Sequence, residues 1–347
     1  MEMKTDELKT KEIVFCAFKN PVIYKNTESD FPISIPIHVP QPVVDSQTQT
    51  QATPQTNNTQ LNGNKILNSL DDQKAIMKYQ NLLIESSDEE IKKIVNDLKG
   101  KYRELILDKN GNFFCKDLFK TCDRNERIEI LKELSPTLSV DCCNNYATHP
   151  LQALIEYSSS SEEYELILSS FIENNNILSS ASTNKNGAYV IQKIIARIPQ
   201  RFRNKFNAIF ISISFFLFIS KQKYGIVSAK KFIENTKGKT ITQNIMNIIR
   251  NNFFDLAKDK FGNYLIPFLL EKWNNYPEVE EIKNLIIKNK DFLSNAKIPT
   301  ETSHVFKKIW ENDKSETINS NKLNEQLEGN NQLMDLLKIN EDNVVSP

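Results

Sequence analysis

The sequence of 347 residues predicts an all-α fold, an α-helical solenoid (superhelix) of three-helix repeats with disordered N- and C-terminal tails. Two observations support this fold class. Apolar residues in the central part recur at helical spacing, and no run alternates with the period of two that is typical of a half-buried strand. A polar turn followed by a short apolar helix also recurs with a nearly constant period, as expected of stacked repeats.

The chain divides into three parts by composition. Residues 43–64 (VVDSQTQTQATPQTNNTQLNGN) contain almost no large apolar residue and cannot bury enough surface to offset the entropy of ordering. We therefore expect a low-complexity, mostly disordered region over 1–64, a helical repeat domain over 65–312, and an Asn/Glu-rich, mostly disordered tail over 313–347. Apolar spacing within that tail is compatible with a short helix at Gln332–Ile339.

Several helices of the repeat domain can be placed individually. Asp88–Leu98 puts its apolar residues on one stripe and its charges on the other side. Ser161–Ile172 and Val279–Ile287 show the same pattern, and both begin with acidic residues, which favour a helix N-terminus.

Composition excludes several protein classes. The 44 Lys+Arg residues balance 44 Asp+Glu residues, which argues against a uniformly basic nucleic-acid-binding protein. Five Cys without a CxxC pair and three scattered His exclude a zinc module by spacing, and the unpatterned Cys count favours a reducing compartment. No catalytic Ser, His, Cys and Asp arrangement and no phosphate-binding glycine loop is present, so we expect neither an enzyme nor a cofactor.

Export and membrane insertion are not expected. The N-terminal residues MEMKTDELKTKEIV lack the apolar core of a signal peptide. Ile209–Ile219 (IFISISFFLFI) is apolar but far shorter than the roughly 20 residues of a spanning helix. We expect it to form a buried helix pair in a soluble protein. Whether that pair is the third helix of one repeat and the first of the next stays open.

The charge is distributed unevenly. Residues 181–260 contain 15 Lys+Arg and 3 Asp+Glu, whereas residues 65–180 contain 14 and 20. The basic part could supply phosphate contacts to a nucleic acid, or it could be a basic outer face that meets solvent or an acidic partner.

The repeated phrase is a polar turn, a glycine and a short apolar helix. Four clear copies are DKNGNFFCKDLFK from Asp108, NKNGAYVIQKIIA from Asn184, KQKYGIVSAKKFIE from Lys221 and DKFGNYLIPFLLE from Asp259. Two weaker copies start at Asn144 and Thr300, with Ala147 and Thr302 in place of the glycine. The residue after the glycine position falls at 112, 148, 188, 226, 263 and 303, so the spacings are 36, 40, 38, 37 and 40. Such a period indicates units that bury their apolar faces against their neighbours.

Phrase and period together resemble the Pumilio (PUF) repeat, whose phrase is D-x-x-G-N-x-V-V-Q-x-L-L-E. The resemblance covers roughly residues 88–312, is strong in four units and weak in two, and suggests a divergent member with about six repeats. A generic helical solenoid of the HEAT or armadillo type remains the alternative, because its periods are similar.

The resemblance implies that the second helix of each unit lines a concave face and reads one base of single-stranded RNA. Three positions of the second helix matter. The first directly follows the glycine, and the third lies four residues after the first; these two would reach the base edge. The second directly follows the first and would stack on the base. The triplets are Asn112/Phe113/Lys116, Thr148/His149/Gln152, Ala188/Tyr189/Gln192, Ile226/Val227/Lys230, Asn263/Tyr264/Pro267 and Ser303/His304/Lys307. The predicted RNA-binding residues are all of these except Ile226, Val227 and Pro267.

The stacking positions match the family better than the edge-reading positions do. Five of the six are flat rings, but no unit has the complete Asn, Tyr, Gln triplet for uracil or the Glu-containing triplet for guanine. The unit at Asn263 ends in Pro267, which can donate nothing, and the unit at Ile226 offers neither a ring nor a polar edge. Each ring could instead belong to the core, the lysines could be solvated surface charges, and His149 and His304 could be capping or packing residues.

The resemblance further implies a monomeric protein that binds mRNA, with the 3′ untranslated region as ligand and protein corepressors as possible partners. We expect it to regulate mRNA translation or decay in the cytoplasm. A family member usually has eight repeats, so fewer units imply a shorter footprint and weaker sequence choice. The alternatives are a nucleolar PUF-like protein of ribosome biogenesis with little base specificity, and a protein-binding helical scaffold without RNA recognition.

Overall fold

The computed structural model describes residues 61–172, 175–315 and 319, and within this range every regular element is helical. The expectations for residues 1–60, for residues 320–347 and for the short helix at Gln332–Ile339 concern residues outside this range. The all-α fold class is confirmed. The folded part begins slightly earlier than expected, because Leu61 and Gly63 are buried and Asn62 caps the first helix.

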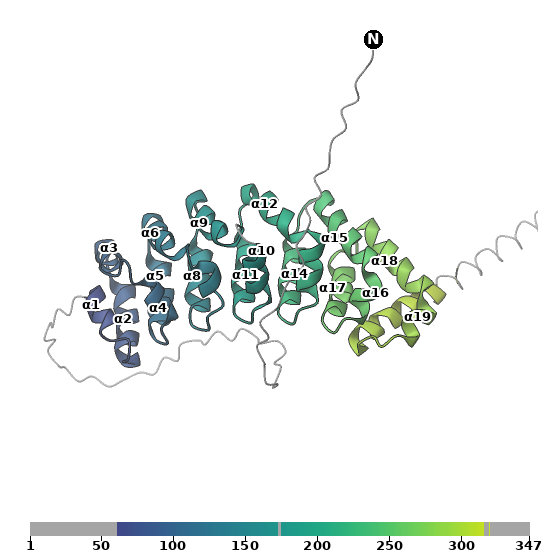
Figure 1. The fold of residues 1–347 in the computed structure, drawn as a ribbon, viewed down its shortest axis with the longest axis horizontal. Coiled ribbons are helices and arrows are strands. Elements are labelled where there is room, and N and C mark those ends of the chain that lie inside the picture. The colour runs from purple at the N-terminus through teal and green to yellow at the C-terminus, as the bar shows by residue number, and fades with distance from the viewer. Residues whose placement is uncertain (1–60, 173–174, 316–318, 320–347) are drawn as a thin grey trace, which may run out of the picture. The chain divides into compact units, whose positions relative to one another are not determined.

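The helices fall into the predicted units, numbered 1 to 6 here from the turn at Asn112 to the turn at Ser303 (Figure 1). Units 1 to 3 comprise α4 (Tyr102–Leu107), α5 (Gly111–Thr121) and α6 (Arg124–Leu134); α7 (Leu138–Asp141), α8 (Thr148–Tyr157) and α9 (Ser161–Ile172); and α10 (Asn175–Thr183), α11 (Gly187–Arg197) and α12 (Gln200–Phe210). Units 4 and 5 comprise α13 (Ile213–Ser220), α14 (Gly225–Asn235) and α15 (Lys239–Asn251); and α16 (Phe253–Lys258), the 3-10 turn η1 (Gly262–Tyr264), α17 (Leu265–Lys272) and α18 (Pro277–Lys288). Unit 6 contains α19 (Lys290–Asn295) and a helix over residues 300–315.

One further unit precedes the six that the sequence predicts. It consists of α1 (Gly63–Leu67), α2 (Gln73–Glu85) and α3 (Asp88–Asp97), and we call it the N-terminal unit. Its third helix α3 begins with a capping box, in which the Ser87 hydroxyl accepts from the Glu90 amide while the Glu90 carboxylate accepts from the Ser87 amide.

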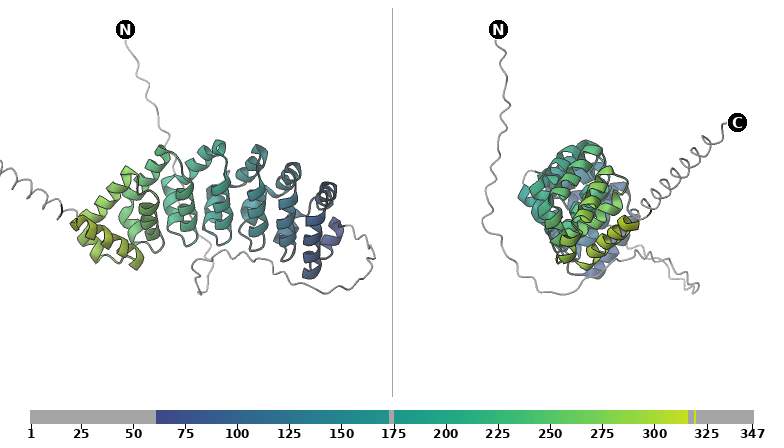
Figure 2. Two further views of the ribbon diagram at one scale, coloured as in Figure 1. Left: turned by 180° about the vertical axis from the view of Figure 1, so that it is seen from behind. Right: turned by 90° about the vertical axis from the view of Figure 1, so that its right-hand side faces the viewer.

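The second helices of successive units form a continuous row. α5 packs against α2 and α8, and α11 packs against α8 and α14, which also contacts α17. The third helices α3, α6, α9, α12, α15 and α18 form a separate row along one side of the units (Figures 1 and 2). Stacking of this kind buries each apolar face against the next unit, as expected of a repeat protein.

The glycine that opens the second helix is required by close approach. A Cβ atom at Gly187 would lie 2.5 Å from the backbone oxygen of Ala181, and one at Gly225 would collide with the backbone oxygen of Ile219. Neither glycine has a positive φ, so the requirement here is space between the first and second helices and not backbone conformation.

The apolar run Ile209–Ile219 is divided between two units, which answers a question that the sequence leaves open. α12 ends at Phe210, α13 begins at Ile213, and the two helices are bent by 79°. The buried Phe210 ring lies 4.6 Å from the ring of Phe232 and 5.0 Å from that of Phe215. In the described part of the chain, no single helix is long and apolar enough to span a membrane, and only this bent pair reaches that length and composition.

Candidate nucleic-acid interface

In units 1, 2, 3 and 5 the second helix begins after a turn held by one side-chain oxygen. In unit 1, Oδ1 of Asp108 accepts hydrogen bonds from the amides of Asn110 (2.8 Å) and Gly111 (2.7 Å). The corresponding pair of bonds is made by Asn144, Asn184 and Asp259 in units 2, 3 and 5. Short Asx side chains favour such turns, so in these four units the residues that mark the repeat also fix the backbone before the second helix.

The first residue of each triplet closes this turn from inside. Asn112 and Asn263 are buried, and Nδ2 of Asn112 donates to the carbonyls of Asp108 (2.8 Å) and Lys109 (2.9 Å). Thr148 is also buried and donates to the Asn144 carbonyl at 2.9 Å. Ala188 and Ile226 fill the same place with apolar side chains, whereas Ser303 is half-buried. These positions stabilise the turn, and base reading by Asn112, Thr148, Ala188, Asn263 and Ser303 stays a prediction.

The second residue of each triplet is at the surface in every unit. Phe113, Tyr189, Val227 and Tyr264 are 45%, 56%, 44% and 39% exposed, and His149 and His304 are exposed as well. We call these six residues the exposed row. The alternative that the rings belong to the core is therefore wrong for Phe113, Tyr189 and Tyr264. Large apolar rings at equivalent surface positions of successive units are available to stack on a ligand.

The third residue of each triplet lies directly beside the first. Nε2 of Gln192 donates to the carbonyl of Ala188 at 3.0 Å, and Nε2 of Gln152 donates to the carbonyl of Thr148 at 3.2 Å. Lys116 and Lys230 are half-buried, and Lys307 is exposed. The predicted proximity of first and third positions is thus observed, because residues four apart share a helix face.

Unit 4 departs from this pattern at all three positions. Ile226 is apolar, Val227 has no ring, and Lys230 reaches towards unit 5. Its Nζ lies 5.5 Å from the ring centroid of Tyr264 and 5.2 Å from that of Phe268, within the range of cation–π attraction. Burial lowers the pKa of Lys230, and this effect outweighs the opposing influence of nearby glutamates.

Unit 5 departs from the pattern at its third position, which is Pro267. Proline has no amide hydrogen, so the Asn263 carbonyl lacks its usual donor four residues later, and the helix opens with η1. The Thr302 hydroxyl of unit 6 fills this gap, since it lies 2.7 Å from Asn263 Oδ1 and 3.2 Å from the Asn263 carbonyl oxygen. Thr302 takes the place of the repeat glycine, and its side chain joins two units.

The N-terminal unit adds a seventh set of positions that the sequence did not reveal. Thirty-six residues before Asn112, Phe113 and Lys116 stand Ile76, Met77 and Gln80. Ile76 is buried, Met77 is 56% exposed, and Nε2 of Gln80 donates to the Phe113 carbonyl at 3.3 Å. The period alone could have indicated this unit. It was missed because Ala75 stands where most other units have the repeat glycine, and Met77 stands where most have the exposed ring.

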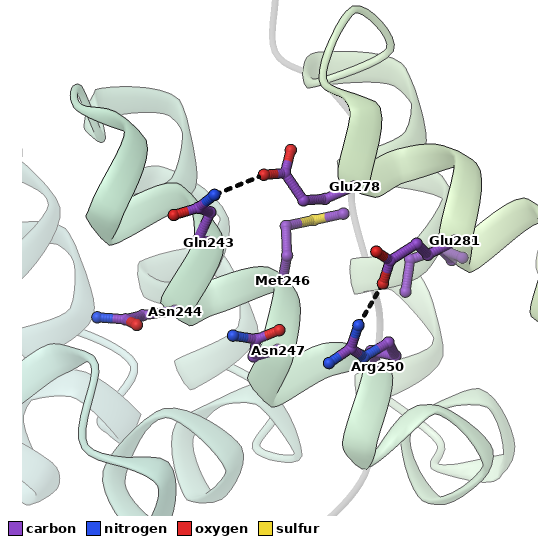
Figure 3. Close-up of a pocket in the computed structure, with 8 residues that line it drawn as sticks. Gln243, Asn244, Met246, Asn247, Arg250, Glu278 and Glu281 are labelled. Carbon is purple, nitrogen blue, oxygen red and sulfur yellow. Dashed lines mark hydrogen bonds and ion pairs between the residues drawn. The ribbon is translucent and has the colours of Figure 1, made fainter.

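A hollow lies elsewhere, between the third helices α15 and α18 (Figure 3). It has a volume of about 390 Å³, and Gln243 donates to Glu278 at 3.0 Å across it, while Arg250 pairs with Glu281. The exposed row, by contrast, is an open surface on the second helices. Among the described residues, no group of three His, Cys, Asp or Glu side chains could hold a metal ion.

The pattern described as the Pumilio-family RNA binding repeat matches residues 101–135, 182–205 and 252–284. Each matched segment contains the turn and second helix of a unit, namely units 1, 3 and 5. The segments of units 1, 3 and 5 are therefore similar to Pumilio repeats in sequence as well as in period.

Two relatives similar in sequence are named as Pumilio proteins. Pumilio homolog 12 of Arabidopsis thaliana is 23% identical over 219 residues, which is 61% of this chain and 36% of that protein. A Pumilio domain-containing protein of Schizosaccharomyces pombe is 26% identical over 223 residues, 64% of this chain and 32% of that protein. The chain thus spans about a third of the length of these relatives.

Solved structures share the fold. The RNA-binding domain of yeast Puf5p bound to SMX2 RNA superposes with a TM-score of 0.61 at 22% identity, covering 70% of this chain and 68% of that one. The Puf4 RNA binding domain bound to the HO endonuclease RNA 3′ UTR recognition sequence gives 0.62 at 23% identity, covering 67% and 72%. The helical repeat architecture predicted from the sequence is thereby confirmed as that of Pumilio domains.

Proposed function

We propose that this chain binds single-stranded RNA along the exposed row. The observation that carries the proposal is the recurrence of flat, surface-exposed side chains at one position of the second helix in units 1, 2, 3, 5 and 6. The match of three segments to the Pumilio-family RNA binding repeat supports it, as do structural neighbours that are bound to RNA.

Stacking is expected to supply more of the affinity than base-edge reading. Each base stacked on an aromatic side chain contributes about 1–3 kcal/mol and does so for any base. The first positions of units 1 to 5 are buried, and Pro267 has no donor at all, so few polar groups remain for the base edges. The proposal is therefore a short footprint with modest sequence preference.

In the cell we propose a post-transcriptional role without catalysis. The chain would act as a monomer in the cytoplasm, bind 3′ untranslated regions of mRNA, and alter translation or decay through recruited corepressors. The support is the match to the Pumilio-family RNA binding repeat together with a structural neighbour bound to a 3′ UTR recognition sequence.

The test is selection of RNA from a randomised single-stranded pool by the full-length chain. The Tyr189→Ala/Tyr264→Ala variant removes two rings of the exposed row. Tyr157→Ala is the matched control, because Tyr157 is 43% exposed but lies at the opposite end of α8 from His149. We expect enrichment of a short motif that the double variant loses and the control retains.

Other outcomes would point to the alternatives. Binding without enrichment would favour the nucleolar type of Pumilio protein with little base specificity. Absence of binding at low salt would contradict RNA recognition and favour the protein-binding scaffold.

A further inference from the structure

A lysine stands at the same place in the turn of four units. Lys109, Lys185, Lys223 and Lys260 each precede the exposed-row residue of their unit by four positions, and all four side chains are exposed. Unit 2 has Asn145 and unit 6 has Thr300 at this place. The four lysines belong to units 1, 3, 4 and 5, and we call them the turn lysines.

Hydrogen bonds fix the backbone of the turn lysines in units 1 and 5. The carbonyl of Lys109 accepts from Asn112 Nδ2 and the carbonyl of Lys260 accepts from Asn263 Nδ2, each at 2.9 Å. The preceding Asp108 and Asp259 anchor the other side of each turn. The lysine therefore has a defined position relative to the ring that follows it on the second helix.

Successive turns are also joined to one another. Nδ2 of Asn110 donates to the carbonyl of Leu70 in the N-terminal unit at 2.7 Å, and Nδ2 of Asn186 donates to the carbonyl of Cys143 at 3.1 Å. Both donors are turn residues that directly precede the repeat glycine. Each bond therefore holds the turn of one unit next to the turn of the preceding unit. The turn lysines consequently form a line that runs beside the exposed row.

The charge of this line is concentrated in its middle. The residue before the lysine is a carboxylate in units 1 and 5 (Asp108 and Asp259) but is neutral in units 3 and 4 (Asn184 and Gln222). Two lysines in turns that lack this carboxylate, Lys185 and Lys223, should attract an anion more strongly than the other two.

We propose that the turn lysines bind the phosphates of the same single strand whose bases stack on the exposed row. This inference rests on the proposed function and adds where the sugar-phosphate backbone runs. In units 1, 3 and 5 the ring that follows the lysine by four residues holds a base, and the turn at the helix start holds the sugar-phosphate backbone. Cations at one place of the repeat in units 1, 3, 4 and 5 match a polymer with one negative charge per nucleotide.

The experiment measures the affinity of the full-length chain for short oligouridylate and oligoadenylate as a function of salt concentration. The test variant is Lys109→Gln/Lys185→Gln/Lys223→Gln/Lys260→Gln. The matched control removes four exposed lysines on or next to the third helices, Lys205, Lys237, Lys239 and Lys288, by the same substitution. The test variant should lower the slope of log affinity against log salt by about 0.7 for each phosphate that is no longer neutralised, equally on both RNAs. Its Lys→Arg counterpart should keep the slope.

The outcomes separate this inference from the proposed function. Suppose that the unchanged chain binds RNA, and that the test variant keeps the salt slope or loses no more affinity than the control. Phosphate binding by the turn lysines is then wrong, while RNA binding stands. If the unchanged chain binds no RNA, both are wrong. If the test variant loses binding to polyglutamate and the unchanged chain prefers that polymer to RNA, the lysines serve an acidic protein partner, which also overturns the proposal.

Discussion

Units 3 and 4 are neighbours built on one plan. Their second helices, α11 and α14, each contain 11 residues, each begins at a glycine pressed against the preceding helix, and each buries the residue that follows it. Stacking on the adjacent second helix imposes these features, because a unit cannot bury its apolar face alone.

The same two units differ where side chains meet solvent. Tyr189 in unit 3 and Val227 in unit 4 are both about half exposed, and Gln192 is replaced by Lys230. Exposed positions bear little of the packing energy, so a unit can lose its ring without losing its fold. The comparison teaches that the repeat is maintained by the buried positions, whereas the ability to bind a base can vary from unit to unit.

The largest expected effect tests whether the buried helix contacts of units 3 and 4 are equivalent. Gly187→Ala and Gly225→Ala should each lower the free energy of unfolding by about 1–3 kcal/mol, because the added methyl group meets backbone that cannot move aside. Gly262→Ala is the control, since its Cβ would first meet the flexible Leu256 side chain at 3.0 Å, and it should cost less. Urea denaturation measures all three. Clearly unequal costs at Gly187 and Gly225 would contradict the equivalence.

The next effect concerns RNA affinity. Tyr189→Ala should weaken binding by about 1–3 kcal/mol through loss of one stacking surface. Val227→Ala should leave affinity unchanged, although it removes a side chain of similar exposure from the next unit. Titration of both variants with one selected RNA measures the difference, and equal losses would show that the row does not act by stacking.

A smaller effect is expected from giving unit 4 a ring. Val227→Tyr should raise affinity by about 1 kcal/mol, at the lower end of the stacking range, because Lys230 already covers the neighbouring Tyr264 ring. The melting temperature should not change, since residue 227 is at the surface. Lower affinity together with unchanged folding would mean that unit 4 accommodates its nucleotide in a way that the ring obstructs.

The smallest effect is a pH dependence at Lys230. Burial lowers its pKa in the folded chain, so the charged form disfavours folding below that pKa, and stability is gained as pH rises from the folded pKa to the unfolded value near 10.4. Relative to Lys230→Met, the unchanged chain should therefore become more stable between neutral pH and about pH 10. Thermal melts at several pH values provide the measurement. A relative loss of stability with rising pH would show that the rings of Tyr264 and Phe268 favour the cation more than burial disfavours it.

The sequence was sufficient for the period and the helical class, because apolar spacing and Asx–glycine turns are local signals. It correctly placed α9 at Ser161–Ile172. It predicted a helix pair at Ile209–Ile219 without deciding which units the two helices belong to. It missed the N-terminal unit, since Ala75 and Met77 replace the two residues that mark a repeat. Subtracting one repeat period of 36 residues from Asn112 would have led to Ile76.

The finer properties of the site depend on packing between units and could not be predicted. Asn112 and Asn263 look like base-reading residues by position, yet both are buried within their own turns. Lys230 meets rings about one repeat further along the chain, and Thr302 bonds to Asn263 across a unit boundary. Such interactions are set by how adjacent units stack, which no single repeat encodes.

The sharp bend between α12 and α13 has a mechanical consequence for the array. Only Ile211 and Ser212 join the two helices, and the rings of Phe210, Phe215 and Phe232 close the junction on both sides. The connection between units 3 and 4 is therefore short, and separating the two units would break the contacts among these aromatic rings. Under tension along the chain, the first and last units of the described part, each stacked on one described unit, should detach first and leave this middle junction as the last to yield.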